Sequence, residues 1–128
     1  MTEQRSIEIL VVDDSPTMRQ LVVHGLRRLP GAKLEEAGDG VEACKKLAGK
    51  VYDLVMLDIN MPLLDGLKVL AHIRSSKNNA TTAVIMLTTE GGEVEKQRAG
   101  ELGANAYLTK PTQAMVLQRT VKQILGIG

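Results

Sequence analysis

A short stretch near the N-terminus decides the fold: Ile9-Leu10-Val11-Val12-Asp13-Asp14-Ser15-Pro16, a hydrophobic run that ends at two adjacent aspartates. A second run, Leu54-Val55-Met56-Leu57, ends in the same way at Asp58. Runs this apolar are typical of strands that are buried on both faces, as in a parallel sheet. If the two strands are neighbours, their carboxyl ends bring three carboxylates together. Such a cluster requires a cation, a raised pKa or both, so we expect chemistry at this edge of the sheet.

Working outward from these runs, short apolar segments alternate with segments of helical period along the whole chain. Ser15 and Pro16 are typical of a helix N-cap and first turn. The alternation predicts five strand–helix units, with strands at about 7–12, 33–37, 54–57, 83–87 and 105–108. We therefore predict an α/β fold with a five-stranded parallel sheet, doubly wound with five helices, in one domain spanning residues 1–128.

The helical period also predicts which side chains face the core. In the first helix this face comprises Met18, Leu21, Val22, Gly25, Leu26 and Leu29. In the second helix it comprises Val41, Cys44, Leu47 and Ala48.

Composition restricts the partners of the chain. Its 128 residues carry a net charge of +1, which indicates neither a nucleic-acid stripe nor an acidic tail. Two Tyr and no Phe or Trp leave few side chains for stacking on single-stranded nucleic acid. No apolar stretch approaches the roughly 20 residues of a membrane span, and the N-terminus lacks a signal-peptide pattern. We expect a cytoplasmic protein with no nucleic-acid or membrane partner, in which the lone Cys44 is a small core residue.

The residues at the predicted strand ends suit one kind of chemistry. Asp13, Asp14, Asp58, Thr88 and Lys110 all follow apolar runs, and ligands of doubly wound sheets bind outside the carboxyl ends of the strands. Clustered carboxylates are hard oxygen ligands, suited to Mg²⁺ or Mn²⁺. Together with a lysine and a hydroxyl they favour phosphoryl transfer. Taken singly, each residue has a simpler interpretation, such as a helix cap for Asp13 or Asp14 and a solvated loop lysine for Lys110.

Five motifs, in order along the chain, resemble the receiver domain of two-component response regulators, of the stand-alone, chemotaxis type. They are Val11-Val12-Asp13-Asp14-Ser15, Asp58-Ile59-Asn60-Met61-Pro62, Asp65-Gly66, Leu87-Thr88 and Tyr107-Leu108-Thr109-Lys110-Pro111. The resemblance implies the flavodoxin-like strand order 2-1-3-4-5.

The resemblance also implies a role for each motif. Asp58 accepts a phosphoryl group from a sensor histidine kinase. Asp14, Asp58 and the main-chain carbonyl of Asn60 hold Mg²⁺, and Asp13 reaches the ion through water. Lys110 pairs with the phosphate, and the bond from Lys110 to Pro111 is cis. Thr88 moves toward the phosphoryl group and lets Tyr107 turn inward, which changes the surface of the fourth helix, fifth strand and fifth helix.

Two positions bear on how long the phosphoryl group stays. Asn60 and Glu90 are similar to their counterparts in fast-turnover chemotaxis regulators. Asn60 also stands where aspartyl phosphatases of the haloacid dehalogenase type have a second acid, and an amide cannot transfer protons in that way. The resemblance thus favours a timed switch that catalyses only its own phosphorylation and slow dephosphorylation, not an enzyme; a Mg²⁺-dependent phosphatase is the alternative it disfavours.

With no output domain after Gly128, we expect the switch to act by contact with an output protein, and a flagellar motor switch is the leading candidate. A phosphorelay intermediate serving a histidine phosphotransferase is the runner-up, and a dedicated phosphatase is a further partner. The chain departs from the family pattern at Thr112, usually Phe, and at Thr89, usually Ala or Gly. Leu63 and Leu64 either pack inward or form part of a docking site.

Overall fold

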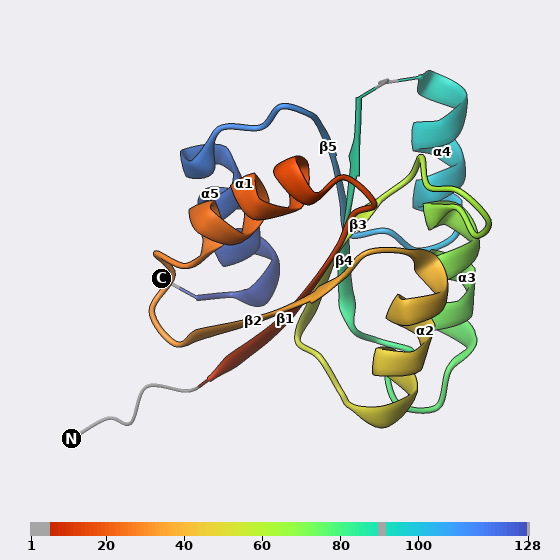
Figure 1. Cartoon of the computed structure of the whole chain (residues 1–128), viewed down its shortest axis with the longest axis horizontal. Coiled ribbons are helices and arrows are strands. Elements are labelled where there is room, and N and C mark those ends of the chain that lie inside the picture. Colours follow the sequence, from red (N-terminus) through yellow and green to blue (C-terminus); the bar gives the residue numbers. More distant parts are fainter. Residues whose placement is uncertain (1–5, 90–91, 128) are drawn as a thin grey trace.

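The computed structural model describes residues 6–89 and 92–127, in which strands and helices alternate (Figure 1). Glu90 lies outside these residues. The strands are β1 (Ile7–Val12), β2 (Ala32–Ala37), β3 (Leu54–Asp58), β4 (Ala83–Thr88) and β5 (Ala106–Thr109). The helices are α1 (Pro16–Leu26), α2 (Gly40–Gly49), α3 (Gly66–Ser75), α4 (Glu93–Glu101) and α5 (Ala114–Leu125).

The strands form one parallel sheet in the order β2-β1-β3-β4-β5, which confirms the predicted fold class and strand order. In its register, Val12 of β1 pairs with Leu57 of β3, and Thr88 of β4 pairs with Thr109 of β5. Every residue of the central strand β3 is buried, as expected for a strand covered on both faces. The winding reverses between β1 and β3, so the carboxyl ends of these two strands open onto a shared crevice.

Helices cover both faces of the sheet. Figure 1 shows α1 and α5 together on one face and α2, α3 and α4 on the other. Two hydrophobic clusters correspond to these layers; one includes Val23 of α1 and Leu117 of α5, and the other includes Leu47 of α2 and Leu70 of α3. In the part of the chain that the structure describes, no helix is long and apolar enough to cross a membrane.

The predicted core faces of α1 and α2 need correction. Leu21 is 58% exposed and Val41 is 46% exposed. Instead, α1 buries Val23, which packs in the same hydrophobic cluster as Ile9 and Val11 of β1. In α2 the buried residues are Gly40, Ala43 and Leu47, since the first turn fits beneath the loop at Leu64.

Candidate functional site

Three carboxylates meet at the carboxyl ends of β1 and β3. Asp13 and Asp14 follow the last residue of β1, and Asp58 is the last residue of β3. One oxygen of each lies within 4.8 Å of the others. Asp13 and Asp58 are 2% and 3% exposed, whereas Asp14 is exposed. A cluster made only of carboxylate oxygens, open on the Asp14 side, fits a hard divalent cation and has no soft ligand.

Lys110 supplies a positive charge beneath the acids. Its Nζ lies 2.9 Å from Asp13 Oδ2 and 3.2 Å from Asp58 Oδ1, and the residue is 8% exposed. The peptide bond between Lys110 and Pro111 is cis. Burial alone would lower the pKa of Lys110, but the hydrogen bond to Asp13 and the charge of Asp58 outweigh it and raise the pKa. The ammonium group therefore stays charged and partly balances the acids.

The environment of Asp58 works against its ionisation. Burial, and next the charge of Asp13, raise the pKa of Asp58 to about 6, although Lys110 opposes the shift. At neutral pH, Asp58 is thus an ionised carboxylate in a position that disfavours its charge. A second cation bound beside Asp58, or a group that neutralises the Asp58 charge, is therefore stabilised at this position.

Thr88, at the end of β4, connects Asn60, in the loop after Asp58, to Tyr107 of β5. It is fully buried, and Asn60 Nδ2 donates to its hydroxyl across 3.4 Å. The Thr88 side chain also shares a hydrogen bond with Tyr107 of β5. Burial, then the charge of Glu95 on α4, raise the pKa of the Tyr107 phenol. The half-buried ring therefore lies between the site and α4.

Two main-chain contacts hold the acid pair in place. Asp13 Oδ1 accepts a hydrogen bond from the Ser15 N–H at 2.9 Å. The Asp13 carbonyl accepts one from Arg19 Nη1 at 2.7 Å. Arg19 was not among the residues predicted to form the site. The available signal was an arginine one turn into the helix that follows the acid pair.

The two leucines in the loop after Asp58, Leu63 and Leu64, lie in different environments. Leu64 packs on the core, as the inward interpretation predicts for it. Leu63 is 91% exposed and has a φ of 68°, in the left-handed region. The loop after Asp58 therefore presents the Leu63 side chain to solvent.

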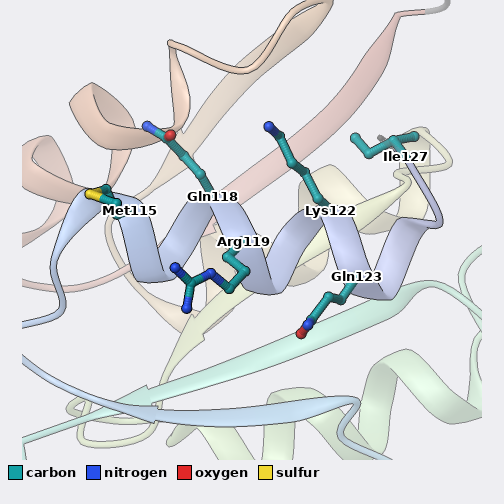
Figure 2. Close-up of a pocket in the computed structure, with 6 residues that line it drawn as sticks. All are labelled: Met115, Gln118, Arg119, Lys122, Gln123 and Ile127. Atoms are coloured by element: carbon teal, nitrogen blue, oxygen red, sulfur yellow. The ribbon is translucent and has the colours of Figure 1, made fainter.

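The other departures from the family pattern lie around the same edge. Thr89 is exposed next to Thr88. Thr112 Oγ1 donates to the Thr109 carbonyl at 2.7 Å, and beside it a hollow of about 470 Å³ reaches Lys110 between α1 and α5. Another hollow, along α5, is lined by Met115, Gln118, Arg119, Lys122, Gln123 and Ile127 (Figure 2). That hollow contains none of the clustered acids.

Sequence comparison identifies the family. The model of the response regulator receiver domain matches residues 9–122. A chemotaxis protein CheY homolog of Campylobacter jejuni is 37% identical over 123 residues, covering 95% of each chain. Chemotaxis protein CheY1 of Helicobacter pylori is 39% identical over 121 residues, covering 94% of this chain and 98% of the relative.

Solved structures have the same fold. Chemotaxis protein CheY4 of Vibrio cholerae superposes with a TM-score of 0.87 at 34% identity, covering 93% of this chain and 98% of the other. The receiver domain of the sensor histidine kinase PA1611 of Pseudomonas aeruginosa, solved with a magnesium ion coordinated in its active site cleft, gives a TM-score of 0.86 at 30% identity, covering 94% and 98%. The chain therefore belongs to the response regulator receiver domain family of two-component signalling.

Proposed function

We propose that this single receiver domain is a switch that is turned on when Asp58 accepts a phosphoryl group from a sensor histidine kinase. The observation that carries the proposal is the position of Asp58, a buried carboxylate at a strand end, 3.2 Å from Lys110 Nζ. In the transfer, an Asp58 oxygen bonds to phosphorus as the bond from phosphorus to the donor histidine nitrogen breaks. Lys110 then balances the charge of the phosphoryl oxygens.

Magnesium is the ion that we propose for the carboxylate cluster. Asp14 and Asp58 would hold it together with the Asn60 carbonyl, and Asp13 would reach it through water. When bound, the ion neutralises charge on the transferred group. The oxygen-only donor set and the exposed Asp14 support this assignment, as does the magnesium ion in the related receiver domain.

The switch would work through Thr88 and Tyr107. A phosphoryl group on Asp58 attracts the Thr88 hydroxyl, which already shares a hydrogen bond with Tyr107. Moving Thr88 breaks or redirects that bond, so the two positions of Tyr107 differ in stability before and after phosphorylation. Because Tyr107 lies on β5, next to α4, the surface of α4, β5 and α5 would change and bind an output protein.

Asn60 supports a switch over a phosphatase. Its amide donates to Thr88 and cannot act as an acid or base, so the acyl phosphate would be lost slowly. Together with Glu90, Asn60 would tune the lifetime of the phosphorylated state.

The chemotaxis names of the relatives favour a flagellar motor switch as the output partner. The likeness to the receiver domain of a sensor kinase keeps a histidine phosphotransferase, and hence a phosphorelay, as the second candidate.

Phosphorylation by a small donor tests the proposal. We expect acetyl phosphate with MgCl₂ to give a one-phosphate adduct by intact mass, and EDTA to prevent it. Asp58→Asn should give none. Asp39→Asn is the matched control, because Asp39 caps α2 outside the cluster and asparagine caps equally well. No adduct on the wild-type chain, or an undiminished adduct on Asp58→Asn, would overturn the proposal, and rapid turnover of phosphate esters would favour the phosphatase.

A further inference from the structure

Arg19 of α1 lies behind the acid cluster and joins two strand ends. Its Nη1 donates to the Asp13 carbonyl at 2.7 Å, and its Nε donates to Glu36 Oε1 of β2 at 2.9 Å. The Asp13 N–H still bonds to the Ala37 carbonyl of β2, at 3.1 Å. Beyond that bond the chain leaves the sheet. Arg19 therefore provides a hydrogen-bond donor to the main chain at the point where strand pairing ends.

This contact bears on Asp14, whose side chain is exposed. The direction of that side chain depends on the two peptide planes that flank it. Arg19 holds the plane before Asp14 through the Asp13 carbonyl. The plane after Asp14 is held by the Ser15 N–H, which donates to Asp13 Oδ1. Removing Arg19 releases one of these two planes and leaves the other.

The charge of Arg19 is balanced locally. Glu36 pairs with it, and the arginine side chain is 18% exposed. Gln20 Nε2 donates to the same Glu36 oxygen at 2.7 Å and makes none of the contacts to Asp13 found among the described residues. Gln20 thus contacts Glu36 as Arg19 does, but lacks the hydrogen bond that links Arg19 to the acid cluster.

We propose that Arg19 is a positioning residue, which presets Asp14 for the divalent cation by fixing the Asp13–Asp14 peptide. The inference rests on the metal site of the proposed function. Groups that orient ligands without touching the metal commonly change its affinity by about 10–100-fold when they are removed.

A positioning role and a purely electrostatic role of Arg19 predict opposite changes in Mg²⁺ affinity, so the test separates them. By charge alone, replacing Arg19 with a neutral residue removes a positive group near the acids and tightens the binding of a dication. By position, the same change loosens Asp14 and weakens binding.

The experiment follows amide signals of the ¹⁵N-labelled chain during titration with MgCl₂, for the wild type, Arg19→Gln, Arg19→Lys and Gln20→Ala. We expect Arg19→Gln to raise the Mg²⁺ Kd about 10-fold or more. Its Asp14 and Ser15 amide signals should already be shifted before any metal is added. Arg19→Lys should recover part of the affinity, because an ammonium group can still donate to the Asp13 carbonyl but lacks the guanidinium geometry that also reaches Glu36. Gln20→Ala should bind as the wild type does.

The outcomes separate the inference from the function on which it rests. Thermal unfolding identifies the folded variants, and Arg19→Lys replaces Arg19→Gln if the latter is unfolded. Unchanged or tighter Mg²⁺ binding in folded Arg19→Gln, or in Arg19→Lys where it replaces Arg19→Gln, overturns the positioning role, as does equal weakening in Gln20→Ala. If the wild type itself binds no Mg²⁺, the metal site of the proposed function fails and this inference fails with it.

Discussion

Gly66, the first residue of α3, packs directly on the main chain of Asp58. A β-carbon at Gly66 would lie 2.2 Å from the Asp58 carbonyl oxygen, far inside van der Waals contact. The Gly66 N–H donates to the Ile59 carbonyl at 2.9 Å. The loop between β3 and α3 thus returns to the strand end that carries the candidate acceptor, and only a residue without a side chain fits there.

Gly66→Ala is therefore expected to destabilise the protein, because the methyl group displaces the Asp58 carbonyl or the start of α3. Overpacking of this kind costs about 1–3 kcal/mol in free energy of unfolding. Urea denaturation followed by circular dichroism measures the loss. Gly49→Ala is the matched control, since no heavy atom lies within 4 Å of its added carbon and it should stay within about 1 kcal/mol of the wild type. Equal stability of the two variants would contradict the packing argument.

The sheet could be predicted because its strands carry their own signal. Runs such as Leu54-Val55-Met56-Leu57 are apolar at every position, so burial on both faces follows from the sequence alone. The meeting of Asp13 with Asp58 then follows from geometry, because neighbouring parallel strands end at the same edge. The strand order itself came from the family resemblance, since no local pattern of residues specifies which strands are adjacent.

The features that could not be predicted from the sequence depend on contacts between distant segments. The aliphatic residues of α1 by themselves allow two faces, and the burial of Val23 depends on its packing with residues of β1 and α5. Arg19 went unnoticed because it binds a main-chain carbonyl and a side chain of another strand. The left-handed backbone conformation of Leu63 could not be predicted either, because leucine rarely adopts it.

Leu63→Asn is expected to raise the free energy of unfolding. Leu63 has a φ of 68° and is 91% exposed, so replacing it removes little packing and relieves an unfavourable backbone conformation. Asparagine adopts this conformation more readily, and we expect a gain of about 0.5–1 kcal/mol. Urea denaturation is the measurement. Leu21→Asn, also an exposed leucine but within α1, should lose stability instead, because asparagine is a poorer helix former. A loss at Leu63 would show that its side chain is held by packing.

Lys110→Met should destabilise the protein by about 3 kcal/mol at pH 7.5 in EDTA, because it leaves two buried carboxylates without their cation. The loss should shrink at pH 5, where Asp58 takes up a proton. Unfolding in urea at both pH values tests this. Lys122→Met removes a lysine on α5 that makes no ion pair among the described residues, and it should change stability by less than about 0.5 kcal/mol. Equal effects of the two substitutions would mean that Lys110 does not balance the acids.

Asp58→Asn should stabilise the protein at neutral pH in the absence of divalent cations. The pKa of Asp58 is about 6 in the folded chain, against an ordinary value of 3.8, so the folded state binds this proton more tightly than the unfolded state does. Stability is therefore lost as pH rises from about 4 to about 6, and the loss persists above that range. A difference of about two pKa units corresponds to at most about 3 kcal/mol.

Urea denaturation in EDTA at pH 4, 5, 6 and 7 measures how the gain of Asp58→Asn grows with pH. Asp39→Asn, which keeps the cap of α2, should stay within about 0.5 kcal/mol of the wild type at pH 7. A gain for Asp58→Asn that is the same at pH 4 and pH 7 would arise from packing and not from charge. A gain that grows across this range means that ionised Asp58 is held at a cost in stability, which a bound cation or a phosphoryl group paired with Lys110 can offset.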